Sequence, residues 1–164
     1  MNRTYRRVVA VMGGSICTPH QAEMARAVGR LLAERGAVVI CGGMTGVMEA
    51  VADGARSAGG LTIGILPGAS AQESPPNPHI EVALFTGLRE GRNYLIASAC
   101  EGAIAIGGGY GTLSEIALAL RMGKPIVLVD TWEFHLRGET IEVPTATTAE
   151  EAVETLWQMM EGRR

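Results

Sequence analysis

A glycine-rich run with one threonine and one glutamate is the stretch best suited to chemistry. It reads Gly107, Gly108, Gly109, Tyr110, Gly111, Thr112, Leu113, Ser114, Glu115, and it lies between the apolar residues 103–106 and a helical pattern at 116–120. A glycine loop between a strand and a helix lets backbone N–H groups approach a ligand, and the positive end of the helix favours an anion. The run therefore predicts a phosphate or carboxylate site.

Two interpretations of Glu115 are open. Thr112 is a good N-cap, and Glu115 stands three residues later, where a capping-box acid belongs. Alternatively, Glu115 faces the ligand, and the helix dipole should then keep its carboxylate ionised.

Two further glycine loops follow apolar runs. The first contains Gly13, Gly14 and Ser15, and the second contains Gly42, Gly43, Thr45 and Gly46. Ser15, Thr45 and Thr112 are the side-chain hydroxyls that could join the backbone around a phosphate.

The elements that position these loops alternate between strand and helix. Apolar runs predict strands at 8–12, 38–40, 61–66, 80–85, 103–106 and 126–129, with a short last strand at 139–143. Helices are expected at 21–34, 47–58, 89–100, from Thr112 onwards, and at the C-terminus. This order predicts a Rossmann-like three-layer α/β/α domain over residues 1–164, with a mostly parallel sheet of six or seven strands. The glycine loops then share the carboxyl edge of the sheet, and the proline-rich segment 67–79 is expected to be an exposed loop and a candidate lid.

Composition narrows the function. The net charge of −3 argues against nucleic-acid binding, and the three separated cysteines favour a reduced, cytoplasmic protein. No apolar run is long enough for a membrane span, and the histidines lack metal-ligand spacing, so we expect neither a membrane nor a metal partner. The second strand ends in Cys41 where a dinucleotide-binding unit has an acid, which disfavours NAD.

At this point the motifs resemble a known family. The run from Gly107 to Glu115 is similar to the PGGxGTxxE signature of the Lonely Guy proteins, once labelled lysine decarboxylases, which cleave the N-glycosidic bond of cytokinin riboside 5'-monophosphates. The resemblance implies Arg92 and Glu115 as a catalytic pair, no cofactor, and a homodimer or homotetramer. Two positions depart from the pattern: Gly107 replaces its proline, and Asn93 replaces its lysine. Within the superfamily, residues 46–50 and 60–68 look closer to the molybdenum cofactor carrier proteins, which bind a phosphorylated pterin.

The matching Arg92 and Glu115 favour nucleoside monophosphate hydrolysis, and carriage of a phosphorylated ligand by the same loops is the alternative. As a phosphoribohydrolase, the protein would hold a nucleoside 5'-monophosphate by its phosphate while Glu115 stabilises the oxocarbenium-like ribose, with Arg92 neutralising phosphate or holding Glu115. As a carrier or sensor, it would bind a phosphorylated ligand such as the molybdenum cofactor without cleaving it. A pyridoxal phosphate decarboxylase is not expected, because the only lysine, Lys124, lies beyond the helix that follows the loop.

Overall fold

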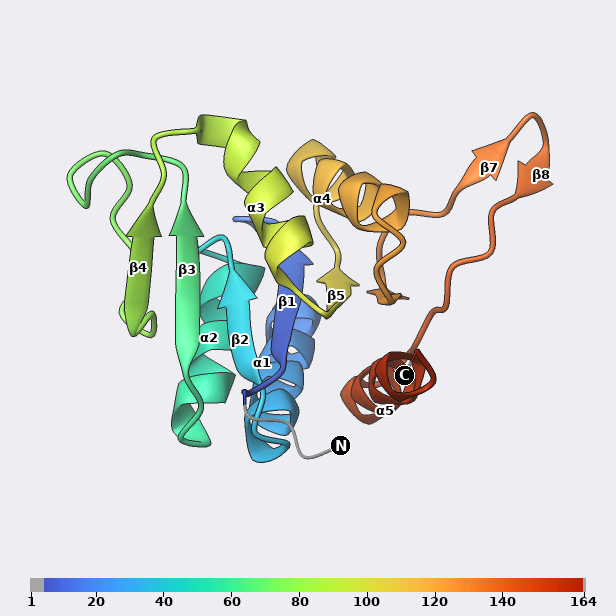
Figure 1. Cartoon of the computed structure of the whole chain (residues 1–164), viewed down its shortest axis with the longest axis horizontal. Coiled ribbons are helices and arrows are strands. Elements are labelled where there is room, and N and C mark those ends of the chain that lie inside the picture. Colours follow the sequence, from blue (N-terminus) through green and yellow to red (C-terminus); the bar gives the residue numbers. More distant parts are fainter. Residues whose placement is uncertain (1–4, 164) are drawn as a thin grey trace.

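The computed structural model describes residues 5–163 and contains one six-stranded parallel sheet (Figure 1). The strand order is β4-β3-β2-β1-β5-β6, and every neighbouring pair is parallel. The strands are β1 (Val8–Gly13), β2 (Val38–Cys41), β3 (Thr62–Leu66), β4 (Val82–Phe85), β5 (Gly102–Ile106) and β6 (Ile126–Val129). The central strands are continuous apolar runs because helices cover both of their faces. The predicted Rossmann-like fold is confirmed.

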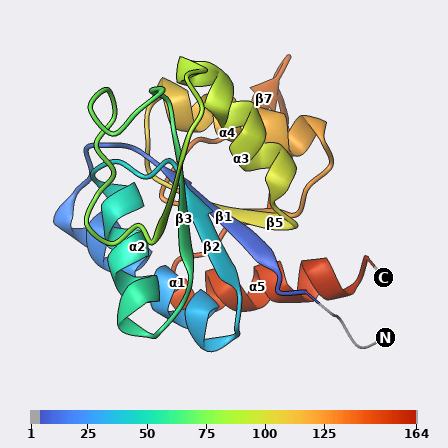
Figure 2. The same ribbon diagram turned by 60° about the vertical axis from the view of Figure 1, so that its left-hand side comes forward.

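In the described residues, five α-helices form the two outer layers. They are α1 (Pro19–Glu34), α2 (Val47–Ser57), α3 (Arg92–Ala99), α4 (Tyr110–Arg121) and α5 (Ala149–Glu161). Figure 2 shows α3 and α4 on one side of the sheet and α1, α2 and α5 on the other. Alternate residues of β1 supply the two cores: Val9 and Val11 pack with the α1, α2 and α5 layer, whereas Ala10 and Met12 pack with the α3 and α4 layer.

The sheet has six strands, and the expected short strand at 139–143 does not join it. Instead β7 (His135–Leu136) and β8 (Glu139–Thr140) form a two-stranded antiparallel hairpin that projects from the domain (Figure 1). The outer edge of β6 is covered by the chain just beyond, where Leu128 N–H donates to Pro144 O at 2.8 Å and Ala146 N–H donates to Leu128 O at 3.0 Å. The short strand expected at 139–143 is confirmed only at Glu139–Thr140, and it adds no seventh strand to the sheet because the chain around Pro144 and Ala146 already occupies the free edge of β6.

The proline-rich loop between β3 and β4 is attached to the domain. Asn77 is 8% exposed, and its side-chain amide donates to Met44 O at 2.7 Å while its backbone N–H donates to Gly43 O at 2.9 Å. Ser74 is also buried, and its hydroxyl accepts from Gly68 N–H. Most of the remaining loop is exposed, as expected, but these bonds fix its path beside the second glycine loop.

Candidate ligand-binding site

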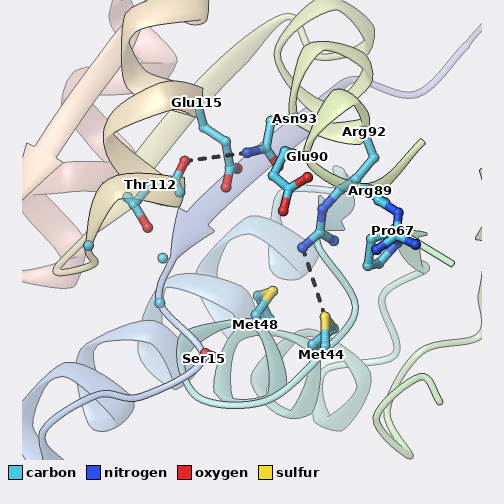
Figure 3. A pocket seen from close by; sticks show the side chains of 14 residues that line it. Ser15, Met44, Met48, Pro67, Arg89, Glu90, Arg92, Asn93, Thr112 and Glu115 are labelled. Carbon is cyan, nitrogen blue, oxygen red and sulfur yellow. Dashed lines mark hydrogen bonds between the residues drawn. The ribbon is translucent and has the colours of Figure 1, made fainter. Parts of the chain in front are cut away.

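A cavity of about 410 Å³ opens at the carboxyl edge of the sheet. After β1 the chain adds β2, β3 and β4 on one side and then crosses to place β5 on the other side of β1. The loops that leave β1 and β5 therefore diverge at this switch in strand order, which is where open α/β sheets bind ligands. The cavity is lined by residues from four loops and helix starts (Figure 3): Gly13, Gly14, Ser15, Met44, Met48, Pro67, Arg89, Glu90, Arg92, Asn93, Gly109, Gly111, Thr112 and Glu115.

The first and second glycine loops are bonded to each other. Val47 N–H donates to Gly14 O at 3.0 Å, and the Thr45 hydroxyl donates to Ser15 O at 2.9 Å. A side chain at Gly46 would place its Cβ 2.3 Å from Gly14 O, so only glycine permits this approach. The hydroxyl of Thr45 thus supports the loop after β1 and does not line the cavity itself.

The third loop presents the start of α4 to the cavity. Helix α4 begins at Tyr110 with Gly109 as its N-cap, and no side chain caps it. The N–H groups of its first turn have no carbonyl partner within the helix, and Gly111 and Thr112 both line the cavity. These donors and the helix dipole suit an anion such as phosphate.

The predicted capping box at Thr112 and Glu115 is wrong. The helix starts before Thr112, so Thr112 lies inside the first turn and Glu115 in the second. Because Gly109 and Gly111 have no side chain that could cap a helix, the sequence did not indicate that the helix starts before Thr112. Glu115 therefore does not cap the helix, and its carboxyl lines the cavity instead (Figure 3).

Burial changes the charge expected of Glu115. The side chain is 7% exposed, and burial raises the pKa of its carboxyl to about 8 although the charge of Arg92 opposes the shift. The expected ionised carboxylate is therefore not the favoured form at neutral pH, because burial outweighs the opposing charge of Arg92. No residue in the described range 5–163 donates a hydrogen bond to this carboxyl.

Arg92 is held by backbone carbonyls. Its Nη1 donates to Gly42 O and to Ile65 O, at 2.5 and 2.6 Å, and its Nη2 lies 3.9 Å from Met44 Sδ. Burial lowers the pKa of the guanidinium, whereas the charges of Glu115, Cys41 and Glu90 raise it. Arg92 thus ties the ends of β2 and β3 together at the cavity wall.

Asn93 occupies the position where the resemblance led us to expect lysine. It is 6% exposed, and its side-chain amide donates to Ser114 Oγ at 2.8 Å and to Gly111 O at 3.5 Å. The amide therefore bonds the start of α3 to the first turns of α4. A neutral amide, fixed by these two bonds, stands where the resemblance has a lysine.

The structure brings about half of the predicted site residues into one cavity. Those that line it are Gly13, Gly14, Ser15, Arg92, Gly109, Gly111, Thr112 and Glu115. The others lie in the same loops without lining it: Gly42, Gly43, Thr45, Gly46, Gly107, Gly108 and Tyr110. Tyr110 is 84% exposed and lies 6.1 Å, centroid to centroid, from the Trp132 ring.

Sequence reasoning did not assign six of the lining residues: Met44, Met48, Pro67, Arg89, Glu90 and Asn93. Pro67 directly follows β3, and the rule that ligands bind at the carboxyl ends of parallel strands would have included it. Met44 lies within the second glycine loop and Met48 follows it, and the two side chains supply an apolar part of the lining. Arg89 and Glu90 carried no motif that set them apart from surface charges.

Other classes of site find little support in the described residues. Lys124 lies at the opposite edge of the sheet, where its ammonium donates to Ser98 O and Cys100 O at 3.0 and 2.7 Å. Within residues 5–163, no three His, Cys, Asp or Glu side chains are grouped to hold a metal ion. None of the described helices is long and apolar enough to cross a bilayer.

The chain is similar in sequence to proteins of known and unknown function. A protein from Archaeoglobus fulgidus without an assigned function is 42% identical over 118 residues, which cover 72% of this chain and 76% of that protein. The cytokinin riboside 5'-monophosphate phosphoribohydrolase of Mycobacterium tuberculosis is 32% identical over 117 residues, covering 67% of this chain and 63% of the enzyme.

A solved structure matches over nearly the whole length. The molybdenum cofactor binding protein from Rippkaea orientalis has 33% sequence identity and a TM-score of 0.85, and the match covers 96% of this chain and 99% of that one. The model of the SLOG cluster4 family matches residues 6–160. The chain is therefore a member of the SLOG cluster4 family.

Proposed function

We propose that this protein binds a phosphorylated heterocyclic ligand, of the kind represented by the molybdenum cofactor, and carries it without cleaving it. The phosphate would lie against the first-turn N–H groups of α4 and the loop of Gly13, Gly14 and Ser15. The heterocycle would extend over Met44 and Met48 towards Arg92. The nearly complete match to a molybdenum cofactor binding protein supports this choice of ligand.

One observation favours carriage over hydrolysis: the state of Glu115. Stabilising an oxocarbenium-like ribose requires a carboxylate, whereas burial raises the pKa of this carboxyl to about 8. Arg92 is bonded to two backbone carbonyls and does not form an ion pair with Glu115. The pair that would act in hydrolysis is therefore not assembled as a charged pair.

Hydrolysis of a nucleoside 5'-monophosphate is the second candidate. A protonated Glu115 could donate its proton to the departing base, and the carboxylate left behind would then face the positive ribose. Two findings support this alternative. The Glu115 carboxyl lines the cavity and accepts no hydrogen bond from the described residues, and the chain is similar to the mycobacterial phosphoribohydrolase.

One experiment separates the two functions. Purified protein is incubated with a panel of nucleoside 5'-monophosphates, free base is measured by chromatography, and ligand binding is followed by thermal shift. Carriage predicts a higher melting temperature with phosphorylated ligands and no base release by wild type or Glu115→Gln. Base release by wild type that is lost in Glu115→Gln would establish the hydrolase. An absence of both binding and release would refute both functions.

We also propose that the protein is a homo-oligomer in the cytoplasm. The edge strand β4 leaves Val82, Leu84 and Phe85 between 37% and 48% exposed, which is an apolar surface suited to a second copy. Sedimentation analysis of the full chain tests the assembly, and a monomer at micromolar concentration would exclude it.

A further inference from the structure

Two charged residues outside the predicted site, Arg89 and Glu90, form the wall of the cavity away from the glycine loops. They belong to a short 3-10 helix, η1 (Arg89–Gly91), immediately before α3. Figure 3 shows Thr112 on one side of the cavity, Arg89 beside Pro67 on the other, and the Glu90 carboxylate pointing towards the space between them. A phosphate held at the start of α4 would leave the far end of its ligand facing this pair.

The backbone of Arg89 is held in an unfavourable conformation. Its φ is +51°, in the left-handed region that residues other than glycine rarely adopt. Three backbone bonds fasten the turn to the end of β3: Thr86 N–H to Leu66 O, Gly87 N–H to Gly68 O, and Arg89 N–H to Pro67 O, at 3.2, 3.0 and 3.0 Å. Strain that the surrounding structure maintains in this way is concentrated at ligand sites.

Both side chains are available to a ligand. Neither the Arg89 side chain nor the Glu90 side chain forms a hydrogen bond or ion pair with another residue in the described part of the chain, although the negative charge of Glu90 also acts on Arg92. Both residues are exposed and line the cavity. Arg92 differs, because its Nη1 already donates to two carbonyl oxygens. The far wall of the cavity therefore offers one donor group beside Pro67 and one acceptor group that points into the cavity (Figure 3).

We propose that Arg89 and Glu90 determine which heterocycle the site accepts, and that they select a 2-amino-4-oxopyrimidine ring, the unit shared by guanine and pterins. In such a ring system the carbonyl oxygen and the adjacent ring nitrogen accept from an arginine, while the ring N–H and the 2-amino group donate to a carboxylate. Adenine changes this pattern, because it presents an amino group where guanine has its carbonyl, a bare nitrogen where guanine has N–H, and no 2-amino group. The arginine would keep only one of its two acceptors, and the carboxylate would lose both of its donors and face a ring nitrogen, a mismatch that opposes binding.

This inference rests on the proposed function, since it assumes that the phosphate lies at the glycine loops. The test measures dissociation constants by calorimetry for GMP, AMP and 6-hydroxymethylpterin phosphate with wild type, Arg89→Asn and Glu90→Gln. Wild type should bind GMP or the pterin at least about tenfold more tightly than AMP, as expected for a bidentate contact. The ligand that binds more tightly would show whether the selected ring belongs to a guanine nucleotide or to a pterin.

The variants should change preference and not merely affinity. Each should weaken binding of the preferred ligand about tenfold while leaving AMP nearly unchanged. Asparagine tolerates the left-handed region, so Arg89→Asn should keep or raise the melting temperature, which separates a ligand role from a structural one. The matched controls are substitutions of exposed residues on other surfaces, Arg121→Asn and Glu23→Gln. They should change neither the affinity for the preferred ligand nor the preference over AMP.

Two results would overturn the inference. If wild type binds AMP as tightly as GMP and the pterin, or if Glu90→Gln keeps the original preference, then this pair does not select the ring, although the phosphate site stands. Failure of all three ligands and of inorganic phosphate to bind would reject the proposed function, and the inference with it.

Discussion

Arg92 and Glu115 line the same cavity without forming an ion pair. The Arg92 guanidinium donates to Ile65 O at 2.6 Å and to Gly42 O, and the Glu115 carboxyl receives no hydrogen bond from the described residues. The charge of each group shifts the pKa of the other, but burial is the larger cause of both pKa shifts. The arginine is consequently a structural tie, and the glutamate is the group left available to a ligand.

Glu115 should make stability depend on pH. Its folded pKa of about 8 lies above the ordinary value of 4.5, so the folded state binds the proton more tightly than the unfolded state. The free energy of unfolding should therefore fall as pH rises from about 4.5 to about 8 and then level off, by roughly 5 kcal/mol at most. Glu115→Gln removes this ionisation, so the variant should match wild type at pH 5 and melt at a higher temperature at pH 9.

The control for this comparison is Glu23→Gln, because Glu23 is an exposed acid on α1. Its melting temperature should follow that of wild type across the range. Equal melting temperatures for Glu115→Gln and wild type at pH 9 would mean that the Glu115 carboxylate is well solvated in the folded protein, contrary to its 7% exposure.

Loss of Arg92 should cost stability even without ligand. Replacing it by glutamine leaves the buried carbonyls of Gly42 and Ile65 without their donor, a loss of about 2–4 kcal/mol for two unsatisfied groups. Urea denaturation measures this difference. Arg121→Gln removes an exposed charge from the end of α4 and should cost little, so equal stabilities for the two variants would contradict the structural role of Arg92.

The parallel sheet and the place of the site follow from patterns that one sequence carries. Six apolar runs followed by turn residues fix the strands, and the rule on carboxyl ends then brings the loops of Gly13 and Gly109 together. The cavity residues at Arg89 and Glu90 could not be found in this way. Their position depends on a turn that three long-range backbone bonds hold against β3, and no local pattern encodes those bonds.

The charge state of Glu115 was beyond sequence reasoning for a different reason. The capping-box spacing predicts an ionised acid at a helix start, whereas the helix begins at Tyr110 and carries Glu115 into the interior. Desolvation depends on everything packed around the side chain, including residues from the sheet and from α3. The sequence spacing contains none of that information.

Thr45 should couple the first two glycine loops. Thr45→Val keeps the side-chain shape but removes the hydrogen bond to Ser15 O, which should cost about 1 kcal/mol and loosen the loop that carries Ser15. Affinity for a phosphorylated ligand should fall several-fold, as measured by calorimetry. Thr155→Val, on α5 and away from the cavity, is the control; an equal effect from it would remove the case for coupling.

Gly46 and Gly36 test how the loops fit together, since they share a left-handed backbone but differ in the space around them. Their φ values are +67° and +76°, so alanine should cost each site about 1–2 kcal/mol in backbone strain. At Gly36 an added Cβ meets nothing within 4 Å, whereas at Gly46 it lies 2.3 Å from Gly14 O. Gly46→Ala must therefore push the loop of Gly14 and Ser15 outward. The Gly46→Ala variant should lose more stability than the Gly36→Ala variant, and it should also lose most of its affinity for phosphate. If both variants bind phosphate as wild type does, the anion does not contact the loop after β1, and the start of α4 alone must hold it.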